Sequence, residues 1–367
     1  MIKPTDGKIG TRELIGLAML TVGTKMSDMT PNLLLKQGMT AAWMLPILSG
    51  LIIVGPLLLL IHLLNKYELG LIELVYKLLG RYLGFLVAFA IFLVALTATV
   101  LDTRSYVDIL GTLYFPKTPV YVIYLILVGA IFFVANRGLE NIGRTAWLIL
   151  PYISIALIVL VFLAWGQHFE FSFLFPLLGP GVWDLAKAGL LYNSVYGDLL
   201  VFPVFFLYVR TGKDYKKASL IGLVITMVIQ VVFMMVYILV FDYHTVLTMV
   251  YPFHQLTRVV QLGRSLMNME AIFLAFWVMS TIVRYSIYLY VTAMSFGYLF
   301  KLREFEPLLL PLTALTFMLG MIPENSMYAD VWLRDKYLLR FVSIFLPLLP
   351  VLLWGVSRFR KKEATAS

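Results

Sequence analysis

The chain has 367 residues, of which 61% are hydrophobic and 13% are charged, and its mean hydropathy is +0.91. A soluble globular protein has about 45–50% apolar and about 25% charged residues, so this chain must be solvated by lipid. The composition excludes a soluble enzyme, a nucleic-acid-binding domain and a disordered chain. We expect the net charge of +9 to set the orientation in the membrane. The lack of cysteine excludes disulfides and thiol chemistry.

Long, continuous apolar runs predict helices that cross the bilayer, because a spanning helix needs roughly 20 mostly apolar residues. Lipid offers no partner for backbone polar groups, which also favours helices. We expect an all-α polytopic membrane protein with ten transmembrane helices, at approximately Glu13–Asn32, Ala41–Leu64, Tyr82–Leu101, Pro119–Ala135, Thr145–Trp165, Leu185–Val209, Ala218–Phe241, Asn268–Phe300, Pro307–Ile322 and Leu338–Val356.

The loops between these helices differ in charge. If the N-terminus lies inside, most lysines and arginines fall in inner segments, as the positive-inside rule requires, and both termini are cytoplasmic. Arg104 and Arg334 are then assigned to outer loops. The segment 67–80 has apolar residues at helical spacing, and it could be an interfacial helix or an ordinary loop. The segment 245–262 is similar on the outer side.

The loops are too short to hold a soluble domain of typical size. We therefore predict one integral membrane domain over residues 1–357, with a first repeat at about 13–165 and a second at about 185–357. Residues 358–367 form a basic cytoplasmic tail.

Polar groups of several predicted helices fall near the middle of the membrane. Lys25, Asp198 and Arg284 lie there, and Thr97 lies near the middle of the third helix. Ionisable groups at this depth are costly and usually face a cavity or a partner. Structural interpretations stay open: Lys25 and Asp198 could be a purely structural ion pair, Arg284 could pair with Asp102, and the threonine could bond its own helix.

The first and sixth predicted helices share an interrupted pattern. Gly23-Thr24-Lys25 precedes Pro31, and Tyr196-Gly197-Asp198 precedes Pro203. Glycine and proline weaken a helix at mid-membrane, although in membrane helices they often serve packing alone. Broken helices at corresponding places in two halves indicate a transporter-type binding site. Five helices per half make the second half inverted, so we predict a five-plus-five inverted repeat with the first and sixth spans broken.

The unwound segments would expose backbone groups to a small polar solute. Lys25 or Arg284 could bind a carboxylate, and Asp198 could bind an ammonium. A zwitterionic amino acid fits this set, as does an inorganic anion, whereas a sugar would use neutral polar groups. Catalytic, metal-ligand and nucleotide motifs do not occur in the sequence, so we predict no enzyme activity, no cofactor and no metal.

The chain resembles the B subunit of the endospore germinant receptor, a spore germination permease of the amino acid–polyamine–organocation superfamily. The resemblance rests on the start Ile9–Glu13, on Asp102-Thr103-Arg104, on Ser286–Tyr290 and on the two glycine–proline segments. It implies a LeuT-like fold and a receptor in the inner spore membrane of an endospore-forming bacterium, with both termini on the spore-core side. Such a subunit binds a small germinant and signals through the receptor's A and C subunits.

The resemblance also implies pocket residues, namely Gly23, Ala98, Val195 to Asp198 and Arg284. The chain departs from the family pattern, which often has a small residue near Lys25, a glutamate in place of Asp198 and a small or neutral residue in place of Arg284, so L-alanine is not assumed as the ligand. The complete set of candidate ligand-binding residues is Gly23, Thr24, Lys25, Thr97, Ala98, Val195, Tyr196, Gly197, Asp198 and Arg284.

Three functions remain open at this stage. The first is a germinant receptor subunit, in which ligand binding shifts a conformational equilibrium. The second is a proton- or cation-coupled amino-acid transporter with Asp198 as the coupling carboxylate. The third is a subunit that conducts water or ions or serves structure alone. The sequence cannot separate the first two, because they share a fold.

Overall fold

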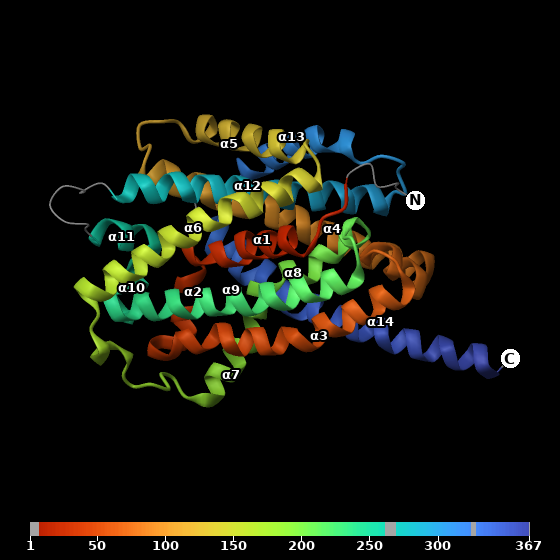
Figure 1. Ribbon diagram of the computed structural model, residues 1–367, viewed down its shortest axis with the longest axis horizontal. Helices are drawn as coiled ribbons and strands as arrows, with labels where there is room; N and C mark the ends of the chain where they lie inside the picture. The colour runs from red at the N-terminus through yellow and green to blue at the C-terminus, as the bar shows by residue number, and fades with distance from the viewer. Residues whose placement is uncertain (1–6, 261–268, 324–327, 367) are drawn as a thin grey trace.

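The computed structural model describes residues 7–260, 269–323 and 328–366, which form a bundle of helices (Figure 1). The α-helices are α1 (Thr11–Val22), α2 (Thr30–Gly38), α3 (Leu45–Tyr67), α4 (Leu71–Leu113), α5 (Val120–Ala135), α6 (Leu139–His168), α7 (Val182–Leu191), α8 (Asp198–Val201), α9 (Gly212–Phe241), α10 (Tyr243–Thr248), α11 (Pro252–Val259), α12 (Met269–Leu299), α13 (Leu309–Gly320) and α14 (Arg340–Ala366). Short 3-10 segments join them, namely η1 (Gly23–Ser27), η2 (Met39–Met44), η3 (Phe171–Leu174), η4 (Asn193–Tyr196), η5 (Phe202–Tyr208) and η6 (Glu306–Leu308), and η7 (Tyr328–Leu339) is a π-helix.

Helical segments occupy all ten ranges predicted to span the membrane. Within the described residues, six helical stretches are long and apolar enough to cross a bilayer as single units, and three further apolar helices are shorter. The first and sixth predicted spans are divided into shorter helices, and the fourth and ninth are the short continuous helices α5 and α13. The protein is therefore an all-α integral membrane protein whose first and sixth spans are broken, as predicted.

The contacts between the two halves of the chain are symmetric: a contact made by a helix of one half is matched by its counterpart in the other half. Helices at equivalent places in the halves contact each other, namely α3 and α9, α4 and α12, and α5 and α13. Other contacts come in matched pairs. The contact of α1 with α9 corresponds to the contact of α7 and η4 with α3. The contact of α12 with α6 corresponds to the contact of η7 and α14 with α4. A five-plus-five inverted repeat predicts such matched contacts between the halves.

The third span differs from its predicted bounds at both ends. Its helix α4 begins at Leu71 and bends at Gly80, where φ is +79°, a value that glycine adopts without strain. The helical turns before the bend bury Leu74, Val75 and Leu78 against the bundle. Of the two possibilities for the segment 67–80, a helix or an ordinary loop, the structure therefore has the helix from Leu71 onwards. At its other end α4 continues to Leu113, well past the predicted end.

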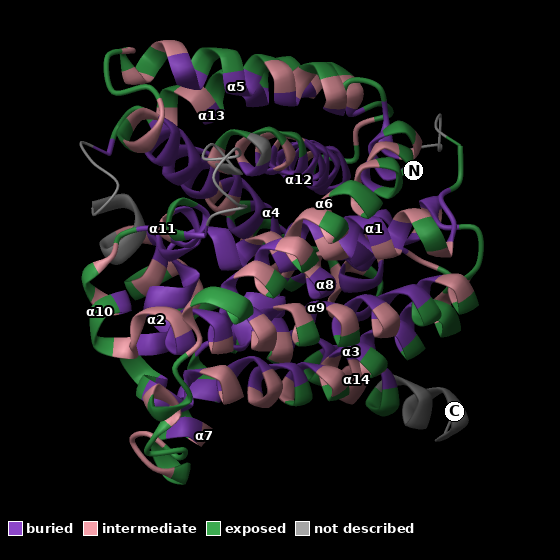
Figure 2. Ribbon diagram, turned by 60° about the vertical axis from the view of Figure 1, so that its left-hand side comes forward, coloured by how far each residue is buried: buried purple, intermediate pink, exposed green. Residues whose placement is uncertain are grey.

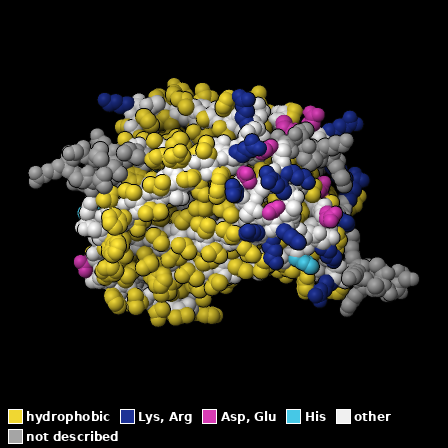
Figure 3. Space-filling model, viewed as in Figure 1, with side chains coloured by type: hydrophobic (Ala, Val, Ile, Leu, Met, Phe, Trp, Pro, Cys, Tyr) yellow, Lys and Arg dark blue, Asp and Glu magenta, His cyan; other side chains and the backbone are white. Residues whose placement is uncertain are grey.

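The surface of the bundle is divided into an apolar band and a charged end. Large apolar side chains such as Ile158 and Phe162 of α6 are exposed, and burial is concentrated inside the bundle (Figure 2). Lysine and arginine side chains gather at one end of the face in Figure 3, and both termini lie towards the same end in Figure 1. Apolar exposure of this kind is solvated by lipid.

A short backbone link joins the two broken spans at this end. Ile9 pairs with Val209 in a parallel bridge, in which the Ile9 N–H donates to the Tyr208 carbonyl at 2.9 Å and the Arg210 N–H donates to the Ile9 carbonyl at 3.0 Å. The start of the first span and the end of the sixth are thereby held side by side.

Candidate functional site

The first span breaks where its glycine lies. Helix α1 ends at Val22, η1 follows, and Asp28 is extended with φ of −100° and ψ of −156° before α2 begins. The Asp28 carboxylate accepts a hydrogen bond from the Thr30 N–H at 2.7 Å, so it occupies the positive N-terminus of α2. The helix end that could attract an anionic solute thus already holds a carboxylate of the protein.

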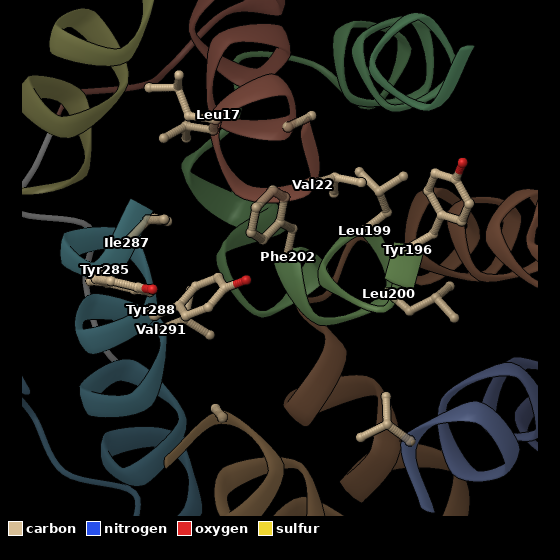
Figure 4. Packing of buried hydrophobic residues seen from close by; sticks show 14 of the residues in the cluster. Leu17, Val22, Tyr196, Leu199, Leu200, Phe202, Tyr285, Ile287, Tyr288 and Val291 are labelled. Atoms are coloured by element: carbon tan, nitrogen blue, oxygen red, sulfur yellow. The ribbon is translucent and has the colours of Figure 1, made fainter. Parts of the chain in front are cut away.

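The sixth span breaks over a longer stretch. Helix α7 ends at Leu191, and η4, the four-residue α8 and η5 follow before the chain leaves the span. In Figure 4 the side chain of Val22 points towards Leu199, and the ring of Tyr288 on α12 points towards Phe202. The two broken spans and α12 therefore meet at one place.

One lysine connects the two breaks. The Lys25 ammonium on η1 lies 2.7 Å from Oδ2 of Asp198 and donates to the Val195 carbonyl at 2.8 Å. The other oxygen of Asp198 accepts a hydrogen bond from the Tyr288 hydroxyl at 2.9 Å. The side chains of Lys25 and Asp198 are only 9% and 15% exposed, so this ion pair is largely withdrawn from solvent.

A cavity of about 70 Å³ lies beside this ion pair. It is lined by Thr30 of α2, by Ala95 of α4 and by apolar residues of η7 and α14 such as Leu338 and Leu346. A single buried water needs about 10–15 Å³, so the cavity can hold a small solute or several waters. Its charged lining residues, within the described part of the chain, are Lys25, Asp102, Asp198 and Arg334.

One buried polar atom at this cavity, the Ser194 hydroxyl oxygen, lacks a hydrogen-bond partner among the described residues. Beside it, Oδ2 of Asp198 is met by the Lys25 ammonium. Unpartnered polar atoms are costly when buried and are normally satisfied by water or a ligand. The wall of the cavity is therefore equipped to bind a polar solute.

A second cluster of charges lies next to the cavity and connects four spans. Arg284 of α12 is 3.0 Å from Asp102 of α4 and 3.7 Å from Asp28. Arg334 of η7 is 3.0 Å from Asp28 and 3.1 Å from Asp102. Each side chain is at most 10% exposed, so four charges balance one another inside the protein.

Five of the candidate residues line the cavity, namely Lys25, Ala98, Val195, Gly197 and Asp198. Arg284 approaches it through Asp102, a lining residue, and its guanidinium also donates to the Thr24 hydroxyl at 3.3 Å.

The other candidates lie elsewhere. Gly23 and Thr24 line a second, mostly apolar cavity of about 60 Å³ between η1, α6, α9 and α12. Thr97 lies in a surface groove beside Tyr337. Tyr196 is fully buried, and its hydroxyl donates to the Pro46 carbonyl at 3.0 Å.

The two glycines of the breaks face different surroundings. A Cβ atom at Gly197 would lie 3.0 Å from the Ser194 carbonyl oxygen and 3.2 Å from Val342. A Cβ atom at Gly23 would meet nothing closer than 3.9 Å. A bulky residue at position 197 must therefore push into the cavity wall, whereas alanine is accommodated at position 23.

The sequence analysis assigned two buried arginines to outer loops. Arg334 belongs to η7, whose polar sequence hides it from a hydropathy scan although the segment packs on α4 and α14. Arg104 lies in the extended part of α4, pairs with Asp108 at 3.0 Å and donates to the Gly320 carbonyl. Asp28 was also not selected as a site residue, although a carboxylate inside a span is the signal that would have found it.

The described residues contain no group of three or more His, Asp or Glu side chains placed to hold a metal ion. What the site offers instead is a set of tethered cations and carboxylates around a small cavity.

The fold and the broken spans define an integral membrane protein with an inverted-repeat fold of the LeuT-like kind. The chain is similar to Mhp1, a nucleobase-cation-symport-1 family transporter solved in a closed conformation with bromovinylhydantoin bound, with a TM-score of 0.69, 10% identity and coverage of 99% of this chain and 96% of that one. It is also similar to a manganese transporter of Eremococcus coleocola, with a TM-score of 0.53, 12% identity and coverage of 94% and 76%. At these identities the likeness shows the fold alone.

The sequence comparisons identify the family. A family model described as "Spore germination protein" matches residues 13–329, and the chain belongs to this family. Three similar proteins come from Bacillus subtilis (strain 168). The putative spore germination protein YfkT is 25% identical over 76% of each chain, spore germination protein A2 is 20% identical over 99% of each, and spore germination protein KB is 22% identical over 64% of each.

Proposed function

We propose that the protein is a germinant-receptor subunit that binds a small zwitterionic solute, most simply an amino acid, in the cavity between its two broken spans. Membership of the spore germination family and a cavity lined by both a cation and a carboxylate support this proposal. The bound solute shifts the arrangement of the broken spans, and partner subunits corresponding to the A and C subunits of a germinant receptor sense that shift.

The charge balance of the cavity is the observation that carries the proposal. Lys25 and Arg334 carry two positive charges, and Asp102 and Asp198 carry two negative charges. The three charged residues selected from the sequence, Lys25, Arg284 and Asp198, sum to +1, which suits an anionic group on the ligand and leaves a zwitterion and an inorganic anion both open. In a balanced cavity, a solute with both charges can contact both kinds of group without leaving one buried charge uncompensated. A zwitterion fits this balance better than an inorganic anion.

The proposed location is the inner spore membrane, with both termini on the spore-core side. The gathering of lysine and arginine side chains at the end that holds the termini supports this orientation.

An amino-acid transporter is the second candidate, which the fold of the transporters similar to this chain favours. Cation or proton coupling would need a carboxylate that is free to bind the ion. Asp198 and Asp102 are both paired with tethered cations, so a coupling ion would have to displace one of these cations to bind. Uptake of a labelled amino acid by the purified protein in liposomes would favour the transporter.

A ligand screen tests the proposal. We expect amino acids, and neither sugars nor simple salts, to raise the melting temperature of the detergent-purified protein. Gly197→Leu should abolish this shift, since its side chain enters the cavity wall, and Gly23→Ala is the matched control that should keep it. A response to sugars or salts alone, or an amino-acid response that survives Gly197→Leu, would contradict the proposed ligand or the proposed site.

A further inference from the structure

The Lys25 ammonium occupies the place where the ammonium group of a bound solute would lie. Its Nζ atom contacts one carboxylate oxygen of Asp198 at 2.7 Å and one backbone carbonyl, that of Val195, at 2.8 Å. Carboxylate and carbonyl oxygens are the acceptors that bind a primary ammonium. The break in the sixth span thus forms an ammonium subsite, and a residue of the first span fills it.

The polar lining beside the subsite is not saturated by Lys25. The Ser194 hydroxyl has no hydrogen-bond partner within the described residues, and it directly precedes Val195, whose carbonyl Lys25 contacts. Ser194 and Asp198 both line the cavity. A solute ammonium at Asp198 can therefore gain a contact with Ser194 that the Lys25 ammonium does not make.

The Lys25 ammonium can also move away from Asp198 without a large change in the backbone. It lies on η1, a five-residue 3-10 segment, and 3-10 geometry forms weaker hydrogen bonds than an α-helix. Its charge sits at the end of a flexible four-carbon stem, so the ammonium can move several ångströms without displacement of the backbone. The adjoining cavity provides the space for such a movement.

We propose that Lys25 is a built-in occupant of the ammonium subsite, which an incoming solute must displace. The solute's ammonium takes the place of the Lys25 ammonium at Asp198 and Val195, and Lys25 then pairs with the solute's carboxylate. This inference rests on the proposed function and names its ligand class, namely solutes that carry a primary ammonium and a carboxylate together. A simple amine is rejected, because it would leave the displaced Lys25 charge unpaired inside the protein.

Removal of the Lys25 side chain tests this directly with ethylammonium as the probe. In Lys25→Ala the subsite is vacant, so ethylammonium should bind saturably and at least tenfold more tightly than to the unmodified protein, and it should raise the variant's melting temperature. Lys187→Ala, which removes an exposed lysine paired with Asp184, is the control and should behave as the unmodified protein. The double variant Lys25→Ala/Asp198→Asn should lose the gained binding.

A second variant keeps the test decisive if Lys25→Ala fails to fold. The chain has no cysteine, so Lys25→Cys carries a single thiol. Its thiolate attacks the sulfur of 2-aminoethyl methanethiosulfonate, a disulfide forms and methanesulfinate leaves, which attaches an ammonium on a short stem. The attached ammonium should abolish ethylammonium binding, whereas the neutral methylthio group that methyl methanethiosulfonate transfers to the thiol should leave the binding largely in place.

Equal ethylammonium binding by the unmodified protein and the Lys25 variants, or no binding by either variant, would overturn the inference and leave Lys25–Asp198 as a structural pair. This result is independent of the ligand screen. A failure of the unmodified protein to bind any amino acid would refute the proposed function even if ethylammonium binds to Lys25→Ala.

Discussion

Replacing Asp102 with asparagine is expected to destabilise the protein by about 3–5 kcal/mol, because it removes one partner of a buried charge cluster. Asp102 contacts Arg284 at 3.0 Å and Arg334 at 3.1 Å. In the variant the two guanidinium groups retain a single carboxylate, Asp28. The loss would be measured as a lower free energy of unfolding in detergent.

The control for this experiment is Asp184→Asn, which breaks an exposed pair with Lys187 and should change the stability by less than about 1 kcal/mol. Combining Asp102→Asn with Arg334→Gln removes one charge of each sign and should recover a substantial part of the lost stability. A loss no larger than that of the control would show that the four charges do not hold the spans together. A double variant that loses the sum of both single effects would show that Asp102 and Arg334 are not coupled.

The second large effect is expected from Asp198→Asn. The asparagine can still accept the Tyr288 hydrogen bond, but it removes the charge that faces Lys25. A hydrogen bond to a charged group contributes about 1.5–3 kcal/mol, so the affinity for an amino acid should fall about ten- to hundredfold. The protein should still insert into the membrane, and equilibrium binding of the amino acid identified by the screen measures the effect.

A double variant separates the role of Asp198 in binding from its role in stability. Lys25→Met/Asp198→Asn leaves no unpaired charge, so the melting temperature should return towards that of the unmodified protein. Amino-acid binding should stay weak, because the ammonium still lacks its carboxylate. If binding returns together with stability, Asp198 serves the fold and does not contact the solute.

Most of the architecture follows from local features of the sequence. Apolar runs of spanning length fixed the positions of the helices, and the glycine–proline patterns around Gly23 and Gly197 located both breaks. The rule that an ionisable group in a membrane usually faces a cavity or a partner left a Lys25–Asp198 ion pair open as an alternative, and the structure contains this pair beside a cavity. It also provided Asp102 as a partner for Arg284. These features could be predicted because each depends on composition or depth within one helix.

The rest depends on contacts between distant segments. Arg334 could not be placed, because η7 is too polar to be recognised as part of a span and is buried only by its packing on α4 and α14. The three charged residues selected as site residues from the sequence, Lys25, Asp198 and Arg284, sum to +1, and Asp28, Asp102 and Arg334 bring the total of the six to zero. Thr97 shares the depth of the site but lies on another face of α4, beside Tyr337, and depth alone does not specify the face of a helix.

The most direct test of the central claim is the protection of a single thiol in the cavity. Ser194→Cys places a thiol at a lining position in a chain without other cysteines, and Ser154→Cys, in the second cavity, is the control. The measurement is the rate of thiol modification by a small methanethiosulfonate reagent, with and without a saturating amount of the amino acid identified by the screen. We predict that the solute slows modification at position 194 at least tenfold and leaves position 154 unchanged. An unchanged rate at position 194 while the solute is bound would place the binding site elsewhere and contradict the account.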